Sequence, residues 1–192
     1  MKQIWDLARS IIQDFHEANN KLSLVKYESN EGWLAPPPGY FKVNVDGASP
    51  LDGNGTSGVD AIVRNSDGKV VAALCKALPS IYPAAWTELF ALEHGIFLAK
   101  QTAISKVIFE SDAALAVQAV SQGSSGGEIG HIIQGILEAK SFFSDCSFRH
   151  VNRAFNGAAH KLAQFAKWNN ASHVWEDDFP LFLNSFSHSA LS

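Results

Sequence analysis

Apolar and polar residues alternate along 41–48, and this pattern predicts a strand with two different faces. The apolar positions are Phe41, Val43 and Val45, and the polar positions are Lys42, Asn44 and Asp46. Gly47 then lets the chain leave the strand or approach another segment closely. Because Asp-Gly is also ordinary turn chemistry, this segment does not identify a functional site by itself.

Two further strands are predicted after a turn-rich segment at 49–55. One covers 59–63 and the next covers 70–77, with the turn residues of 65–68 between them. Three neighbouring strands joined by short connections are typical of an antiparallel meander. The glycines of the turn-rich segment are not followed by the Lys-Ser or Lys-Thr of a P-loop, so we interpret that segment as a loop.

Apolar residues take helical spacing from about residue 83 to residue 100. The stripe they form consists of Leu89, Leu92, Ile96 and Ala99. Glu88 and Glu93 both lie close to this stripe, where an unpaired carboxylate is costly to bury. Periodicity does not decide which of the two has a special role, and either is compatible with the edge of an ordinary helix.

Strands and helices alternate in the rest of the pattern. Strands are predicted at 106–110 and 146–151, and helices at 113–122, 128–143 and 156–168. A strand that follows one helix and precedes another is typical of parallel pairing. Ligands bind at the carboxyl ends of such strands, where Asp46 and Asp112 would both lie. Alternatively, Ser111 or Asp112 simply caps the following helix.

The two ends of the chain differ in pattern from the middle. Residues 2–19 have the spacing of an amphipathic helix, whose apolar stripe would pack on the domain or on a protein partner. A stiff Pro-Pro-Pro-Gly segment at 36–39 marks a boundary. We therefore expect a helix and linker at 1–35, one domain at 36–168, and a tail at 169–192 that docks through Trp175 and Phe179.

Composition sets only broad limits. The 192 residues include 15 basic and 19 acidic side chains, and the net charge of -4 disfavours binding through a broad basic field without excluding a local nucleic-acid site. Cys75 and Cys146 lack the spacing of metal ligands and are expected to be reduced, buried thiols. Since no membrane span or secretory signal is evident, we expect a soluble intracellular protein without membrane contact, in a compartment that the sequence does not specify.

Five segments, taken together and in order, resemble a known family. They are Pro-Pro-Pro-Gly-Tyr-Phe-Lys-Val-Asn-Val-Asp-Gly-Ala at 36–48, Gly-Val-Asp-Ala-Ile-Val-Arg-Asn-Ser-Asp-Gly at 58–68, Thr-Glu-Leu-Phe-Ala-Leu-Glu-His-Gly-Ile at 87–96, Glu-Ser-Asp at 110–112, and His-Val-Asn-Arg-Ala-Phe-Asn-Gly-Ala-Ala-His-Lys-Leu-Ala at 150–163. The arrangement resembles the ribonuclease H fold, and is most similar to the plant retroelement-derived, reverse-transcriptase-associated ribonuclease H type 1 group. The resemblance implies an α/β fold, with a five-stranded mixed sheet of a three-strand antiparallel meander and two parallel strands, flanked by helices.

The resemblance also implies a metal site. Asp46, Glu88 and Asp112 fall on the family's first three catalytic carboxylates, which favours Glu88 over Glu93. Converging carboxylates repel one another unless a cation neutralises them, and oxygen ligands select Mg²⁺ or Mn²⁺. Two such ions can activate a water and stabilise the leaving oxygen when a phosphodiester is hydrolysed. We therefore expect a divalent metal cofactor, with two ions.

The fourth ligand position departs from the family pattern, because His160 stands where active relatives carry an aspartate. Neutral imidazole binds Mn²⁺ but is a poor ligand for Mg²⁺, so the second ion would be held weakly or through water. Alternatively, His160 is a surface residue of a lapsed site. His150 matches a mobile-loop histidine thought to assist proton movement or product release, or is an ordinary strand-end histidine.

Two asparagines complete the expected site. Asn156 matches a polar family position near the carboxylates, and Asn44 is a candidate contact to the substrate backbone. The expected catalytic residues are Asp46, Glu88, Asp112, His160 and His150, of which the first four are also the expected metal ligands.

Two functions follow from these expectations. The first is a metal-dependent endonuclease that hydrolyses the RNA strand of RNA–DNA hybrids and recognises shape and 2′-hydroxyls rather than sequence. The second is a catalytically impaired module of the same fold, retained to bind nucleic acid or protein. His160, the acidic net charge and the Ser/Gly-rich connection at 121–127 favour the second function. A related nuclease or transposase with another substrate fits less well, because the meander motifs match the type 1 group.

Overall fold

Residues 33–123, 126–176, 178–179 and 183 are described by the structure, a computed structural model. Within these residues, six strands form one mixed sheet in the order β5-β4-β1-β2-β3-β6. The strands are β1 (Phe41–Ala48), β2 (Gly58–Arg64), β3 (Val70–Ala77), β4 (Lys106–Ser111), β5 (Asp145–His150) and β6 (Ser172–Trp175). The helices are α2 (Ala84–Gln101), α3 (Ala114–Gln122), α4 (Gly130–Lys140), the short 3₁₀ helix η1 (Arg153–Phe155) and α5 (Gly157–Asn169).

The pairing of the strands follows the predicted topology. β1, β2 and β3 form the antiparallel meander, and β1, β4 and β5 pair in parallel. The parallel pairs follow from the helices between these strands, since a parallel strand is reached only by a crossover. The predicted α/β ribonuclease H-like architecture is therefore confirmed, and the elements predicted between residues 41 and 168 occur within a few residues of their expected limits.

The number of strands is a correction, because a sixth strand lies in the segment expected to be a tail. β6 pairs antiparallel with β3, and Trp175 and Phe179 pack against the adjacent core, as predicted for the docking of this segment. An edge strand forms backbone hydrogen bonds with a neighbour on one side only. The four residues Ser-His-Val-Trp are also too few to show the alternation that predicts a strand. The strand was therefore not visible in the sequence.

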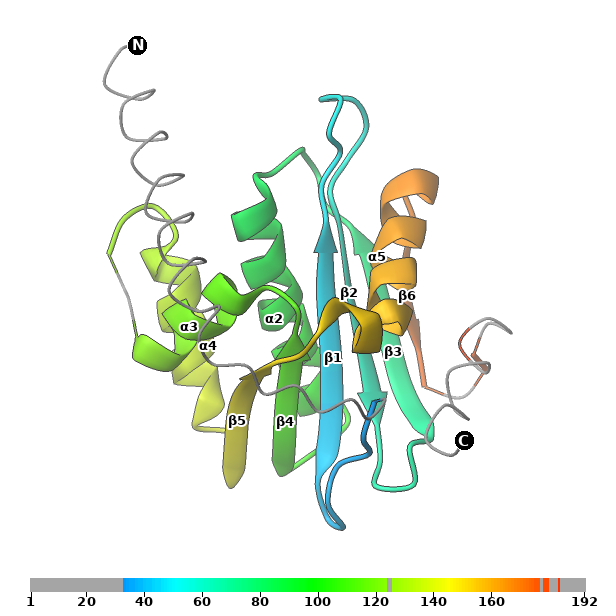
Figure 1. The fold of residues 1–192 in the computed structure, drawn as a ribbon, viewed down its shortest axis with the longest axis vertical. Helices are drawn as coiled ribbons and strands as arrows, with labels where there is room; N and C mark the ends of the chain where they lie inside the picture. The colour runs from blue at the N-terminus through cyan, green and yellow to red at the C-terminus, as the bar shows by residue number, and fades with distance from the viewer. Residues whose placement is uncertain (1–32, 124–125, 177, 180–182, 184–192) are drawn as a thin grey trace. The chain divides into compact units, whose positions relative to one another are not determined.

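Two apolar cores cover the two faces of the sheet. The larger core includes Val43 and Val45 of β1 together with buried residues of α2, α3 and α4. The smaller core joins β2 and β3 to α5, which crosses in front of these strands in Figure 1. Because side chains alternate along a strand, the polar row of β1 points to the same face as α5.

Contacts at both ends of the described chain refine the expected limits of the domain. Trp33 and Leu34, placed in the linker by the sequence pattern, bond to Asn44 and Lys42 of β1. The helix predicted at 2–19, and with it the surface for a protein partner, lies outside the described residues.

Cys75 and Cys146 are buried free thiols, as predicted. None of the helices in the described ranges combines the length and apolar character needed to cross a membrane.

Candidate active site

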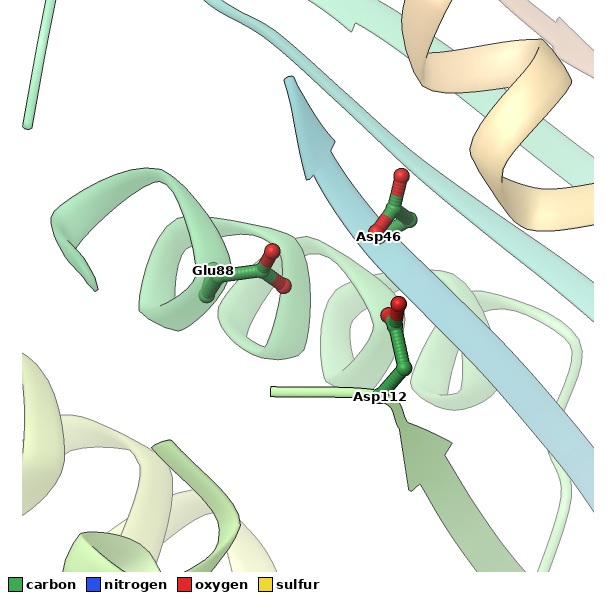
Figure 2. Close-up of side chains that lie close together, drawn as sticks. All are labelled: Asp46, Glu88 and Asp112. Carbon is green, nitrogen blue, oxygen red and sulfur yellow. The ribbon is translucent and has the colours of Figure 1, made fainter. Parts of the chain in front are cut away.

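Three carboxylates from separate elements meet at one edge of the sheet. Asp46 belongs to β1, Glu88 to the first turns of α2, and Asp112 follows β4 directly. One carboxylate oxygen from each residue lies within 4.8 Å of the others. Figure 2 shows the three side chains pointing toward one another. The structure thus brings together the three carboxylates that the sequence predicted to be one group.

The convergence has two structural causes. β1 and β4 pair in parallel, so their carboxyl ends, with Asp46 and Asp112, lie at the same edge of the sheet. Gly47 then allows α2 to approach the strand, because a Cβ at this position would lie 2.7 Å from the carbonyl carbon of Thr87 and 2.8 Å from the amide nitrogen of Glu88. The close contact at Gly47 places the backbone of Glu88 beside Asp46.

The electrostatics of the cluster fit a bound cation. Burial, followed by the charge of Asp112, raises the pKa of Asp46 to about 8. Burial and the charges of Asp46 and Asp112 also raise the pKa of Glu88 well above its usual value. The Oε2 atom of Glu88 is buried without a hydrogen-bond partner among the described residues. A divalent cation would satisfy this oxygen and relieve the repulsion, and carboxylate oxygens are the ligands that Mg²⁺ and Mn²⁺ prefer.

Glu93, the alternative that periodicity left open, does not join the carboxylate group found among the described residues. Burial raises its pKa, while His131 and Lys76 act in the opposite direction. Asp112 does not cap α3 either, because the N-cap residue of that helix is Ala113 and no side chain caps it. Ser111 makes a local bond instead, accepting from the amide of Ala113 at 3.0 Å.

His160 lies beside the carboxylates, on α5. Its Nδ1 is 2.9 Å from Oδ2 of Asp46, and the imidazole is partly exposed. Burial, followed by the charge of Arg153, lowers the pKa of His160, which favours a neutral ring. When Asp46 is ionised, a neutral ring with its proton on Nδ1 donates to Asp46 and leaves Nε2 as an acceptor. The fourth position is therefore occupied by a hydrogen-bonded imidazole.

Arg153 is a neighbour of the site to which the sequence pattern gave no role. Its Nη1 lies 3.6 Å from Oδ2 of Asp112, and its Nη2 lies 3.2 Å and 3.3 Å from the two ring nitrogens of His160. The Arg153 side chain is 67% exposed, so its ion pair with Asp112 is weak in water. A single arginine in a short connection has no periodicity to mark it, and only the fold places it next to Asp112.

The remaining expected site residues differ in exposure. His150 ends β5 opposite Ser111 and is exposed, which puts it at the same sheet edge as Asp112. Asn156 donates to Oδ1 of Asp112 at 3.1 Å, and Asn44 bonds to Asn156 at 3.3 Å. Asn44 and Asn156 are each 1% exposed. Both asparagine side chains are therefore buried, and the substrate contacts expected from the sequence stay a prediction.

Comparison with known proteins identifies the family of this fold and site. The Reverse transcriptase-like family model matches residues 44–166, which include the three carboxylates and His160. The chain belongs to this family, and its domain is ribonuclease H-like. A search among curated proteins gives no match to the sequence.

Solved structures share the fold at low sequence identity. RNase H1 from Halobacterium salinarum is 22% identical, with a TM-score of 0.62 over 69% of this chain and 99% of that one. The N-terminal RNase H domain of a Mycobacterium tuberculosis protein is 20% identical, with a TM-score of 0.60 over 79% and 99% of the two chains. LC11-RNase H1, solved in complex with an RNA/DNA hybrid, is 15% identical, with a TM-score of 0.61 over 68% and 98%.

Proposed function

We propose that this protein is a metal-dependent endonuclease that hydrolyses the RNA strand of RNA–DNA hybrids. The observation that carries the proposal is the convergence of Asp46, Glu88 and Asp112 at one sheet edge of a ribonuclease H-like domain. The hybrid bound by the structural neighbour LC11-RNase H1 supports this class of substrate. The sequence motifs further favour an origin in a plant retroelement.

The three carboxylates are the proposed ligands of the divalent cation. The unpaired Oε2 of Glu88 and the raised pKa values of Glu88 and Asp46 support this assignment. Bound Mg²⁺ or Mn²⁺, as one ion or two, would supply a nucleophilic water and stabilise the leaving oxygen. Asp46, Glu88 and Asp112 would orient the reacting phosphate through the cation, and the exposed His150 would move a proton or assist product release at the rim.

His160 is proposed as the fourth ligand, and its chemistry affects the choice of metal. Imidazole nitrogen suits Mn²⁺ better than Mg²⁺, which demands oxygen ligands in near-ideal octahedral geometry. To bind a cation through Nδ1, the ring has to give up its 2.9 Å contact with Asp46. We therefore expect the protein to be more active with Mn²⁺ than with Mg²⁺.

The second candidate is a binding module without catalysis, and one observation favours it. Arg153 and His160 already contact oxygens of Asp112 and Asp46, so the protein's own side chains partly satisfy two of the three carboxylates. A module of this kind would keep the fold and bind nucleic acid, but it would require no metal.

A cleavage assay with matched variants separates these candidates. The full chain is incubated with an end-labelled RNA–DNA hybrid in Mg²⁺ and, separately, in Mn²⁺, beside Asp46→Asn and Glu88→Gln. Glu93→Gln is the matched control, because it removes a carboxylate from the same helix outside the cluster. The proposal predicts that wild type and Glu93→Gln cleave the hybrid, and that Asp46→Asn and Glu88→Gln do not. No cleavage in either metal would contradict the nuclease, and cleavage by Asp46→Asn would indicate a contaminating enzyme.

A further inference from the structure

Directly beneath the carboxylates lies a second layer of polar side chains on the same two strands. β1 and β4 pair in parallel with Asn44 opposite Glu110, each two residues before Asp46 and Asp112 respectively. Since side chains two residues apart share a face, each lower residue points the same way as the carboxylate above it. Asn44 is 1% exposed and Glu110 is 7% exposed, so this lower layer is buried.

Asn44 uses its full hydrogen-bonding capacity within this layer. Its Oδ1 accepts from Nη1 of Arg64 at 2.9 Å and from Nε1 of Trp33 at 3.1 Å. Its Nδ2 donates to Oε2 of Glu110 at 3.1 Å and to Oδ1 of Asn156 at 3.3 Å. An asparagine side chain has two donor hydrogens and two acceptor lone pairs, and all four are engaged here. The amide of Asn44 therefore has one fixed orientation.

Lys42 and Glu110 form an ion pair in this layer, and the Trp33 ring covers Lys42 and Arg64. Nζ of Lys42 lies 2.8 Å from Oε1 of Glu110 and donates to the carbonyl of Leu34 at 2.6 Å. The Trp33 ring lies 5.1 Å from Nζ of Lys42 and 4.7 Å from the guanidinium carbon of Arg64. A buried ion pair is often no more stable than apolar residues of similar volume. Stability alone therefore gives little reason for ionic groups here, which points to a requirement for fixed geometry.

Asn156 connects this lower layer to the metal ligands. Its Nδ2 donates to the carbonyl of Val45 at 2.9 Å and to Oδ1 of Asp112 at 3.1 Å, while its Oδ1 accepts from Asn44. Because Asn44 offers a donor at this point, the oxygen of Asn156 faces Asn44 and its NH₂ group faces Asp112. The orientation of Asn44 thus fixes which end of the Asn156 amide reaches the carboxylate.

We propose that Asn44 and Asn156 are positioning residues that hold the carboxylate of Asp112 in place for a cation. Glu110 and Arg64 fix the orientation of Asn44 through their hydrogen bonds to its amide. This is a different role from the substrate contacts expected from the sequence, and the burial of both side chains supports it. The consequence for cleavage rests on the proposed function, whereas the consequence for metal binding does not. Partners that orient a metal ligand typically change metal affinity by about 10-fold to 100-fold when they are removed.

The test compares Mn²⁺ affinity, measured by calorimetric titration of the full chain, in variants of the lower layer. Asn44→Leu removes all four bonds without touching a carboxylate ligand. Glu110→Gln is the second variant, because it keeps the shape and an acceptor for Asn44 but removes the charge. Ile62→Val is the matched control, since Ile62 is the β2 partner of Asn44, is fully buried and belongs to the smaller apolar core. Circular dichroism confirms that each variant is folded.

The expected result is an affinity for Mn²⁺ about 10-fold weaker in Asn44→Leu and weakened in the same direction in Glu110→Gln, with Ile62→Val close to wild type. In the cleavage assay, kcat should fall with little change in KM for the hybrid. Wild-type affinity in both folded variants would overturn the proposal, and if Asn44→Leu does not fold, Glu110→Gln decides alone. If wild type cleaves no hybrid but the variants still lose Mn²⁺ affinity, the proposed function fails while the positioning role stands.

Discussion

Nδ1 of His160 lies 2.9 Å from Oδ2 of Asp46, so the imidazole occupies one face of the most buried carboxylate in the site. In this arrangement the fourth position contributes a hydrogen bond to Asp46 rather than a negative charge. A cation bound at that side of Asp46 would have a neutral nitrogen as its neighbour. Such a nitrogen weakens the binding of Mg²⁺ more than the binding of Mn²⁺.

Replacing this imidazole by a carboxylate should raise activity with Mg²⁺. We expect His160→Asp to increase Mg²⁺-supported cleavage of an RNA–DNA hybrid by about 10-fold or more, and to reduce the preference for Mn²⁺. Initial rates in each metal measure the effect. His160→Asn is the control, because it is neutral and should leave Mg²⁺-supported activity low. Equal rates for wild type and His160→Asp would mean that the fourth position does not influence the metal.

The stability of the metal-free protein should fall as the pH rises. The pKa of Asp46 is raised to about 8, and that of Glu88 is also raised, whereas unfolded Asp and Glu titrate near about 3.9 and 4.3. Since the folded state holds these protons more tightly, its stabilisation is complete below about pH 4 and is lost as the pH rises toward about 8. Thermal unfolding in the presence of a chelator, recorded across this range, measures the loss.

Added Mn²⁺ should reverse this trend, because the cation competes with the protons on the same oxygens. The increase in melting temperature on adding Mn²⁺ is therefore expected to grow between about pH 5.5 and about pH 8. In Asp46→Asn, the pH dependence with chelator should be smaller and the Mn²⁺ shift nearly absent. A shift of equal size at both ends of the pH range would show that the raised carboxylate pKa values are not coupled to metal binding.

The order of strands and helices from β1 to α5 was predictable from the sequence, because period-two and helical spacing mark these elements, whereas β6 was too short to show a period. Periodicity did not separate Glu88 from Glu93, since both lie on the same helix, and only the resemblance to the family favoured Glu88; in the structure, the contact at Gly47 brings Glu88 to Asp46. Arg153 and the layer around Asn44 could not be predicted either. Their roles depend on parallel pairing of β1 with β4 and on side-chain orientation, and neither leaves a periodic trace in the sequence.

A buried carboxylate next to the site should be dispensable for stability. Asp60 lies opposite Asp46 in the pairing of β1 with β2, is fully buried, and neither of its oxygens has a hydrogen-bond partner among the described residues. Burial, followed by the charge of Asp46, raises its pKa well above the usual value, and the backbone of Asp46 opposes this only in part. Asp60→Val removes this unpaired group and should raise the free energy of unfolding by about 1–3 kcal/mol at neutral pH.

The pH dependence provides the control for Asp60→Val. Because the folded-state pKa of Asp60 is raised, its carboxyl costs little stability below about pH 4 and progressively more as the pH rises. The gain from Asp60→Val, measured by chemical denaturation in the presence of a chelator, should therefore be larger at about pH 8 than at about pH 5. A variant less stable than wild type at both pH values would show that the Asp60 carboxyl has a stabilising partner.

The approach of α2 to β1 should tolerate no side chain at position 47. A Cβ there would lie 2.7–2.8 Å from backbone atoms of Thr87 and Glu88, and backbone cannot move aside as a side chain tip can. We expect Gly47→Ala to destabilise the protein by about 1–3 kcal/mol through overpacking. By displacing Glu88, it should also weaken Mn²⁺ binding by at least about 10-fold.

Gly135→Ala is the matched control, because a Cβ at this exposed position of α4 meets nothing within 4 Å, and alanine should stabilise the helix by up to about 1 kcal/mol. Unfolding by denaturant and calorimetric Mn²⁺ titration measure both effects, and unchanged Mn²⁺ affinity in Gly47→Ala would mean that Glu88 does not need this close contact to reach the cation.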